Sequence, residues 1–147
     1  MSRAVAAAVV VPVLVVSLAS AAACWRTSVA THAVPAPPPA LETHTGIATF
    51  YGQAFHGRTT ASGIPFDMHD LVAAHPTLPF GSLLRITNIR NGRTVQVRVV
   101  DRGPARGARS TGVIIDLSRA AAEQLDFIRR GRVQIRLEVL ARGDDDR

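Results

Sequence analysis

The sequence predicts an all-β domain that closes into a small barrel, with long loops and one short helix. Two observations carry this prediction. Several short segments alternate apolar and polar residues with the period of two that β-strands require, whereas only one short segment has helical character. All of these segments fall within residues 45–141. A barrel is the natural closure for about five or six such strands, because it removes exposed strand edges.

The individual elements follow from local patterns. Strands are predicted at residues 46–52, 83–89, 93–101, 112–118 and 132–140. Asn91-Gly92 joins two alternating runs and is a strong hairpin signal. Residues 118–125 predict a short helix with Ser118 as its N-cap. Residues 53–70 have no period and are rich in Gly, Thr, Ser and His, which indicates a long loop of the kind that usually carries function.

The N-terminus has the layout of a secretory signal peptide, which we place at residues 1–23. A single arginine, Arg3, precedes roughly twenty uncharged, mostly apolar residues that end in small side chains. A segment of this length can also span a bilayer. We therefore expect export to the cell envelope, either the periplasm or the cell surface. Export makes nucleic acid a poor partner, so the net charge of +6 suits anionic lipid or acidic cell-wall polymers instead.

Cys24 is the only cysteine of the chain, so no internal disulfide can form. It follows three alanines in a sequence that resembles a lipobox, in which the cysteine becomes a lipidated N-terminus, although Ala21 replaces the usual leucine. Lipidation, simple cleavage after an Ala-x-Ala sequence and an uncleaved anchor all stay open. Residues 24–44 are rich in proline and predict an extended spacer, and residues 142–147 predict a solvated tail.

Asp101 is the carboxylate that the strand pattern singles out. Val95, Val97 and Val99 point to one face, and Asp101 continues this row where the strand ends. A carboxylate at the rim of a barrel is partly removed from water, which suits a general acid. The Arg-Gly-Pro turn that follows would fix its direction. The alternative is that Asp101 only caps this turn through local hydrogen bonds.

His75 follows a short apolar run and is ambiguous from the sequence alone. A single histidine in such a place is more often a hydrogen-bonded structural group than a catalytic one. No His-Glu-x-x-His motif occurs, and the only cysteine lies next to the signal segment. We therefore expect neither a metal ion nor another cofactor.

Seven sequence blocks together resemble the rare lipoprotein A family. They are GIATFYG, FHGRTTASG, FDM, AAHPTLPFGSLLRITNIRNGR, VRVVDRGP, IIDLSRAAAEQL and VQIRLEVL, in the family's order and nearly its spacing over about 95 residues. The resemblance implies a six-stranded double-psi β-barrel, as in expansins, and an exported cell-wall protein. Characterised relatives are lytic transglycosylases. They cut peptidoglycan strands between N-acetylmuramic acid and N-acetylglucosamine and leave 1,6-anhydro ends.

The resemblance also assigns residues. The catalytic candidates that it implies are Asp101, Asp67 and His75. The substrate-binding candidates, taken from their places in the matched blocks, are Tyr51, Asn88 and Arg102. Many relatives carry a further peptidoglycan-binding SPOR domain, and none is expected here because the chain ends soon after Leu140.

One position departs from the family pattern. A glutamate usually follows the glycine of the TASG block, but Ile64 follows Gly63 here. Two hypotheses result: a lytic transglycosylase, or a non-catalytic, expansin-like module that binds or loosens the wall. Ordinary glycoside hydrolysis needs two carboxyl groups. A lytic transglycosylase needs only one, because the substrate's own 6-hydroxyl attacks the anomeric carbon and proximity favours this intramolecular step. Asp101 can therefore suffice without the glutamate.

Overall fold

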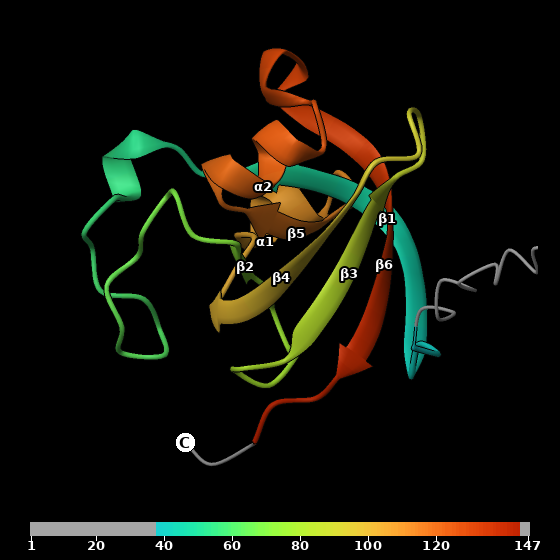
Figure 1. Ribbon diagram of the computed structural model, residues 1–147. Coiled ribbons are helices and arrows are strands. Elements are labelled where there is room, and N and C mark those ends of the chain that lie inside the picture. Colours follow the sequence, from blue (N-terminus) through green and yellow to red (C-terminus); the bar gives the residue numbers. More distant parts are fainter. Residues whose placement is uncertain (1–37, 145–147) are drawn as a thin grey trace, which may run out of the picture. The chain divides into compact units, whose positions relative to one another are not determined.

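A computed structural model describes residues 38–144 of the chain (Figure 1). Six strands close into one barrel in the order β1-β5-β2-β4-β3-β6. Their bounds are β1 (Glu42–Phe50), β2 (Val72–Ala74), β3 (Leu83–Asn88), β4 (Thr94–Asp101), β5 (Val113–Leu117) and β6 (Arg132–Ala141). The prediction of a small all-β barrel is confirmed. The predicted signal peptide, Cys24 and most of the predicted spacer lie outside the described residues.

Two short α-helices and two 3-10 turns complete the described part. They are α1 (Arg106–Arg109), α2 (Arg119–Gln124), η1 (Gln53–Phe55) and η2 (Ile128–Arg130). α2 is the predicted helix, and the Ser118 hydroxyl accepts the backbone N–H of Ala121 at 3.3 Å, as an N-cap does. The sequence does not predict α1, because four residues are too few to show a helical period. Within residues 38–144 no helix is long and apolar enough to cross a membrane.

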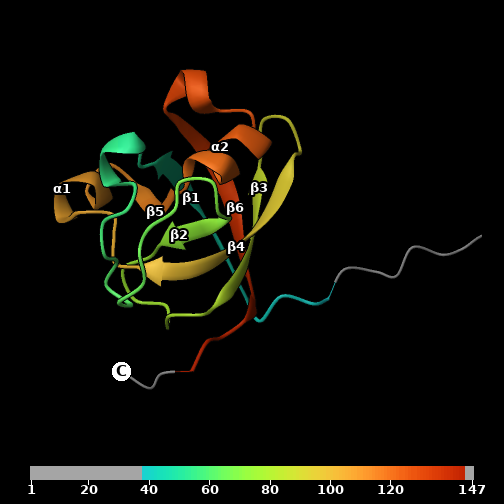
Figure 2. The same ribbon diagram turned by 60° about the vertical axis from the view of Figure 1, so that its left-hand side comes forward.

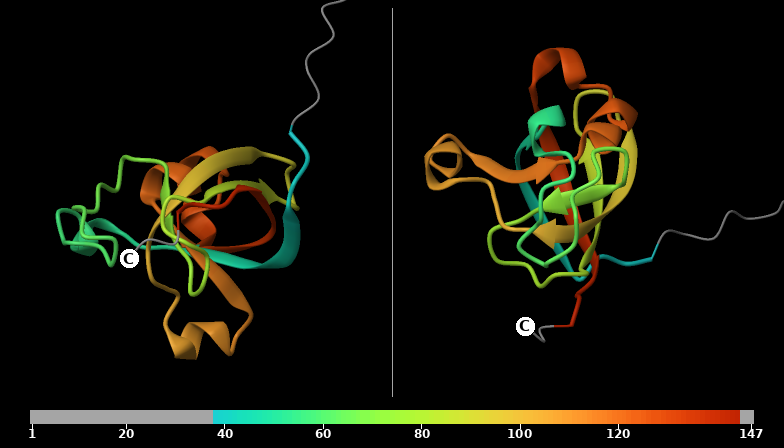
Figure 3. Two further views of the ribbon diagram at one scale, coloured as in Figure 1. Left: turned by 90° about the horizontal axis from the view of Figure 1, so that it is seen from below. Right: turned by 90° about the vertical axis from the view of Figure 1, so that its left-hand side faces the viewer.

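The strands pair in a mixed pattern. β1 runs parallel to β5 and β2 runs parallel to β4, while the other neighbours are antiparallel. The predicted Asn-Gly hairpin joins β3 and β4, with Gly92 at φ 73° in the left-handed region that glycine adopts easily. The short strand β2 lies between β4 and β5 (Figure 2). The loop of residues 51–70 and the segment around α1 project from the barrel in different directions (Figure 3).

The barrel begins before the predicted domain start at residue 45, and it ends at Ala141, the predicted domain end. β1 begins at Glu42 rather than near residue 46, because its first residues pair with the end of β6. After β6, Arg142 forms an ion pair with Glu42, and the backbone N–H of Gly143 donates to the Ser82 hydroxyl at 3.0 Å. The first residues of the predicted tail are therefore attached to the barrel.

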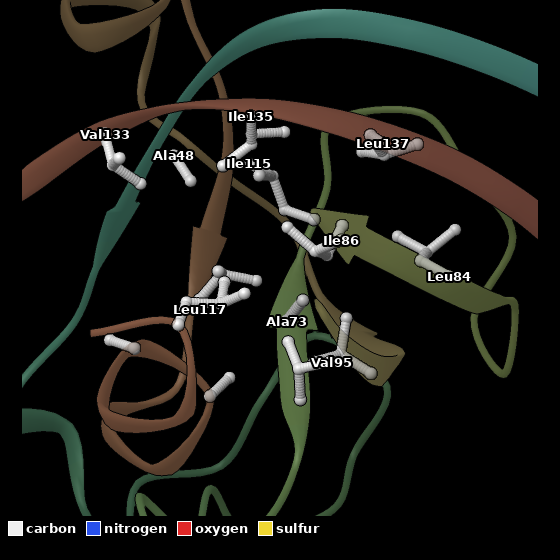
Figure 4. Close-up of a cluster of buried hydrophobic side chains, with 14 of the residues drawn as sticks. Ala48, Ala73, Leu84, Ile86, Val95, Ile115, Leu117, Val133, Ile135 and Leu137 are labelled. Atoms are coloured by element: carbon white, nitrogen blue, oxygen red, sulfur yellow. The ribbon is translucent and has the colours of Figure 1, made fainter. Parts of the chain in front are cut away.

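Aliphatic side chains fill the barrel interior, as the low aromatic content of the sequence leads one to expect (Figure 4). The alternating valines of β4 are buried as predicted, with Val95, Val97 and Val99 at most 5% exposed. Phe127 adds one fully buried aromatic ring, which meets Phe50 edge-on with 5.8 Å between ring centres. Burial of this apolar surface is the main force that closes the sheet.

Asn88 has a structural role at the end of β3. It is 1% exposed, its side-chain amide donates to the carbonyl of Leu125 at 2.9 Å, and its side-chain oxygen accepts the N–H of Arg90 at 3.0 Å. These bonds connect the β3–β4 hairpin to the end of α2. Both polar ends of the side chain are thus used inside the fold.

Replacing Asn88 with alanine should therefore lower stability. The Asn88→Ala variant leaves the buried Leu125 carbonyl with less hydrogen bonding, which costs about 1–3 kcal/mol in the free energy of unfolding. Urea unfolding followed by circular dichroism measures this loss. Asn91→Ala is the matched control, because Asn91 is exposed and donates to the same carbonyl at 3.1 Å. An equal effect of both variants would contradict the role assigned to Asn88.

Candidate active site

The end of β4 carries a bulge that sets the position of Asp101. In the parallel pairing with β2, Ala73 faces Val99 and Ala74 faces Asp101, so Val100 is an extra residue. Val99 and Val100 are both buried, which ends the alternation before Asp101 is reached. A bulge re-aims the side chain that follows it. The core-facing row of valines therefore leads to Asp101 at the barrel rim but does not by itself decide its direction.

Two backbone N–H groups hold the Asp101 carboxylate in place. Its Oδ1 atom accepts the N–H of Ala61, in the long loop, and the N–H of Arg102, each at 2.8 Å. Among the described residues no hydrogen bond to its other oxygen, Oδ2, is formed. Asp101 thus does cap its own turn, as the structural alternative predicts, and one oxygen stays available for a ligand. The two interpretations of Asp101 are compatible.

A second carboxylate, Asp116, lies on the other side of β2. Ala74 pairs with Asp101 on one side and with Asp116 on the other, so the two Cα atoms are two strand spacings apart, about 10 Å. The Thr49 hydroxyl donates to Asp116. Burial raises the pKa of the Asp116 carboxyl above its ordinary value of 3.8, and the bond from Thr49 opposes this shift. Neither the strand pattern nor the resemblance assigns a role to Asp116. The sequence signal that could have pointed to Asp116 is that it is the single carboxylate of an otherwise apolar strand, β5.

Tyr51 lies close enough to these two carboxylates for their charges to act on its phenol. Its hydroxyl is buried and has no hydrogen-bond partner among the described residues. Burial, together with the nearby charges of Asp101 and Asp116, raises the pKa of the Tyr51 phenol, so the phenol keeps its proton and can donate it in a hydrogen bond. The ring packs against Phe66, with 4.3 Å between ring centres. Tyr51, predicted to bind substrate, is thus within electrostatic range of both acids but is hydrogen-bonded to neither.

The close packing of the turn after Asp101 explains why residue 103 is a glycine. A Cβ atom at Gly103 would lie 3.2 Å from the Cβ of Ala74 and 3.3 Å from Oδ2 of Asp116, closer than side chains normally approach. The Asp-Arg-Gly-Pro turn therefore lies directly over Ala74 and Asp116. This close approach accounts for the half-buried state of the Asp116 carboxyl.

A groove of about 930 Å³ adjoins Asp101, and we call it the Arg98 groove. Its wall includes Ala61 and Arg102, whose N–H groups hold Asp101, and its charged residues are three arginines and one aspartate: Arg98, Arg102, Arg142 and Asp144. Ile64 lies on its rim and is 48% exposed. Arginine lining makes the groove attractive to an anionic ligand.

Arg102 lines this groove, as expected for a substrate-binding candidate, and it also has a structural role. Its guanidinium donates to the carbonyl of Leu78 at 2.8 Å and lies 3.7 Å from the ring centre of Phe80. These contacts fix the segment between β2 and β3 against the end of β4. Stacking on an aromatic ring leaves the edge of a guanidinium free for a ligand.

His75 is joined to Asp101 through the backbone, not through its side chain. Its N–H donates to the carbonyl of Asp101 at 3.1 Å, while its ring atom Nδ1 accepts the N–H groups of Leu78 at 3.0 Å and Thr77 at 3.3 Å. Burial, and after it the charges of His44 and Arg102, lowers the pKa of His75 from 6.5 to about 4. The ring is therefore neutral at neutral pH, with its proton on Nε2.

Asp67 belongs to a different network in the long loop. Its Oδ1 accepts the N–H of His69 at 2.8 Å and lies 3.5 Å from Nδ1 of His56. That nitrogen accepts the N–H of Met68 at 3.3 Å, so it cannot also donate to Asp67 while neutral. Within residues 38–144 no hydrogen bond or ion pair joins the side chain of Asp67 to Asp101 or His75. The three predicted catalytic residues are thus not linked through their side chains.

Asn88 lies away from this site. It is at the end of β3 that pairs with the start of β4, whereas Asp101 is the last residue of β4. Its interpretation as a groove residue does not fit this position, because hydrogen bonding to Leu125 and Arg90 occupies its side chain. Within residues 38–144 no group of three or more His, Cys, Asp or Glu side chains could hold a metal ion.

The topology and this pair of carboxylates define the class of protein, a double-psi β-barrel with an acidic site at its rim. A family model described as lytic transglycolase matches residues 43–137. The chain belongs to this family, which confirms the resemblance noted in the sequence.

Curated relatives agree with this assignment. The endolytic peptidoglycan transglycosylase RlpA of Neisseria meningitidis serogroup A is 48% identical over 101 residues, which is 69% of this chain and 41% of that protein. The probable endolytic peptidoglycan transglycosylase RlpA of Aquifex aeolicus is 51% identical over 98 residues, 67% of this chain and 42% of the relative. The chain thus spans about two fifths of the length of these relatives.

Solved structures show the same fold. The Streptomyces papain inhibitor has a TM-score of 0.55 and 29% identity, covering 71% of this chain and 99% of the inhibitor. The apo expansin of Clavibacter michiganensis has a TM-score of 0.53 and 24% identity, covering 70% of this chain and 52% of the expansin. The expansin likeness supports the barrel fold alone.

His75 should titrate near pH 4. In a nitrogen-15 NMR titration we expect a midpoint of about 4 and the proton on Nε2 at neutral pH. Because the pKa in the folded state lies below the ordinary 6.5, His75 contributes stability that is complete above about pH 6.5 and is lost as the pH falls toward 4. His75→Asn is the control, since its side-chain oxygen can replace Nδ1 and the variant should lose this pH dependence without unfolding. A midpoint near 6.5 would contradict the assigned environment.

Asp116 should destabilise the fold when it is charged. Its pKa in the folded state is raised, so its contribution to stability is complete below about pH 3.8 and is lost as the pH rises through the folded pKa. Asp116→Asn should therefore raise the thermal midpoint at pH 7 by a few degrees, and the gain should vanish below about pH 3.8. Differential scanning calorimetry measures both values. Asp70→Asn, at an exposed loop position, should change neither.

Proposed function

We propose that this chain is an endolytic peptidoglycan lytic transglycosylase that leaves 1,6-anhydro-N-acetylmuramic acid ends. One observation carries the proposal: two carboxylates, Asp101 and Asp116, flank Ala74, and the two residues whose N–H groups hold Asp101 line an arginine-rich groove. Membership of the lytic transglycolase family and relatives named peptidoglycan transglycosylases support it. Peptidoglycan is accordingly the proposed substrate.

The two carboxylates suit two different proton transfers. Asp116, whose raised pKa favours the protonated form, donates a proton to the glycosidic oxygen as the bond from the anomeric carbon to this oxygen breaks. The 6-hydroxyl of the same muramic acid attacks the anomeric carbon and passes its proton to Asp101. The ring closes without water, and the leaving sugar keeps the proton from Asp116. The proton on Asp101 is then lost to solvent and Asp116 takes up a proton again, which restores both acids for the next turnover.

Asp67 and His75 act as positioning residues in this scheme. The neutral ring of His75 binds the turn at Leu78, and its backbone N–H binds the carbonyl of Asp101, so it fixes the end of β4. Asp67 orders the loop that supplies the Ala61 N–H to Asp101. Both roles fit residues that affect activity without contacting the reacting atoms.

Ile64, in place of the family's glutamate, changes the side chain at the rim of the Arg98 groove but not the conformation of the loop of residues 51–70. The main-chain carbonyl of Ile64 accepts both the N–H and the hydroxyl of Thr60, each at 2.8 Å, whereas its side chain lies exposed on the groove rim. The loop conformation therefore depends on the backbone at position 64. Position 64 therefore supplies no carboxylate to the groove, while Asp101 and Asp116 are both present.

The alternative, a non-catalytic expansin-like module, has weaker support. The likeness to expansin is at 24% identity and concerns the fold, whereas relatives at 47% identity or more are named transglycosylases. The observation that favours the alternative is Ile64. If this alternative holds, the protein should bind the cell wall without releasing cleavage products.

We also propose that the chain is exported and acts in the cell envelope, held by a lipid on Cys24. The apolar N-terminal segment and the Ala-Ala-Ala-Cys sequence support this proposal. The mass of the mature N-terminal peptide distinguishes a lipidated cysteine from simple cleavage and from an uncleaved anchor.

Product analysis tests the proposed activity. The purified chain, incubated with glycan strands that lack stem peptides, should release 1,6-anhydro products detectable by mass spectrometry. Asp101→Asn should reduce the rate by at least about 100-fold, since it removes the proton acceptor. Asp70→Asn is the matched control and should keep full activity. Tight binding of strands with no product from the wild-type chain would refute the proposed enzyme.

The variant Ile64→Glu tests the missing carboxylate. If the groove-rim carboxylate assists catalysis, this variant should release the same products several-fold faster at unchanged stability, because the Ile64 side chain is exposed and not part of the core. Ile64→Gln, which has the same size without the charge, separates charge from shape.

A further inference from the structure

A second hollow, distinct from the Arg98 groove, lies beside His75. It has a volume of about 570 Å³, and we call it the His75 hollow. Its apolar lining comes from Leu78, Val113 and Ile114, and its polar rim includes Arg109 and His44. An apolar floor with a few polar groups at the edge is typical of sites that bind small molecules or segments of a polymer.

The His75 hollow and the Arg98 groove are neighbours. Arg142 lines both of them. The segment between His75 and Phe80 contributes residues to each, and Arg102 fixes this segment through its bonds to Leu78 and its contact with Phe80. Asp101 is attached to the same segment through the N–H of His75. A polymer in the Arg98 groove can therefore continue over this segment into the His75 hollow.

The charges of the His75 hollow favour an anion. Arg109 is exposed, and no acidic side chain within residues 38–144 pairs with it. Arg142, in contrast, forms an ion pair with Glu42, which also accepts from His44 at 3.3 Å. Glu42 is the acidic residue of the hollow and competes with any anionic ligand for Arg142 and His44.

We propose that the His75 hollow is a second binding site for the same acidic glycan strand, and that a long strand lies across the segment 75–80 from the Arg98 groove to Arg109. This inference rests on the proposed function and adds to it. A sugar ring presents an apolar face, which suits the floor of the hollow, and the lactyl carboxylate of N-acetylmuramic acid suits Arg109 and Arg142. A neutral glycan has no carboxylate and therefore cannot make the contact with Arg109 and Arg142.

The proposal predicts an affinity that depends on strand length and on charge. A disaccharide fills the Arg98 groove alone, whereas an octasaccharide reaches both sites and binds more tightly. Isothermal titration calorimetry with the purified chain measures this for peptide-free oligosaccharides of alternating N-acetylglucosamine and N-acetylmuramic acid. Equally long oligomers of N-acetylglucosamine serve as the neutral probe. Added salt should weaken the advantage of the acidic octasaccharide, because the contacts are at an exposed rim.

Two substitutions should change the affinity in opposite directions. Arg109→Ala should weaken binding of the acidic octasaccharide roughly three- to tenfold and leave the disaccharide unchanged, as expected for the loss of one exposed charge contact. Glu42→Gln frees Arg142 and should strengthen binding of the octasaccharide. Arg119→Ala and Glu123→Gln are the matched controls, because these two exposed residues form a pair on α2 at 2.8 Å and line neither site.

The outcomes separate this inference from the proposed function. If the octasaccharide binds no better than the disaccharide, or if Arg109→Ala acts no more strongly than Arg119→Ala, the second site is refuted while glycan binding stands. If the wild-type chain binds no oligosaccharide at all, both proposals are refuted. A length effect that Arg109→Ala removes and Glu42→Gln enlarges supports the second site.

Discussion

The short strand β2 is the element on which the site depends. It is three residues long, yet it pairs in parallel with β4 and antiparallel with β5. Both partners carry one carboxylate next to Ala74, so the two backbone pairings fix the spacing of Asp101 and Asp116. The residues of β2 are small, and Ala74 leaves room for the Gly103 turn to lie on top of it. A larger residue at position 74 or 103 would push the turn after Asp101 away from Asp116.

The same arrangement works against stability. Asp116 is half-buried, and Tyr51 has a buried hydroxyl without a partner among the described residues. Buried polar groups without hydrogen bonds cost free energy, and proteins keep them mostly where function requires them. The closed barrel with its aliphatic core supplies the stability that such a site needs.

Local patterns predicted most of the barrel but only part of the site. Period-two alternation located β3, β4 and β6, a continuous apolar run located β5, and Asn-Gly located the hairpin, because these signals depend on neighbouring residues. The start of β1 was misplaced because its first residues are polar and are held by pairing with β6. Asn88 shows the same limit, because its hydrogen-bond partner Leu125 lies far along the chain and can be assigned only in the folded protein.

By itself the sequence determined the class of fold and the family, and it singled out Asp101 as a candidate, because these follow from periodicity and from motifs that are contiguous in the chain. Only the tertiary structure decided that Asp116 stands beside Asp101, that Asp67 belongs to another network, and that a second hollow adjoins the groove. The physical reason is strand pairing between distant segments. β2 brings together residues 101 and 116 through two sets of backbone hydrogen bonds, and no local pattern encodes which strands will be neighbours in a closed barrel.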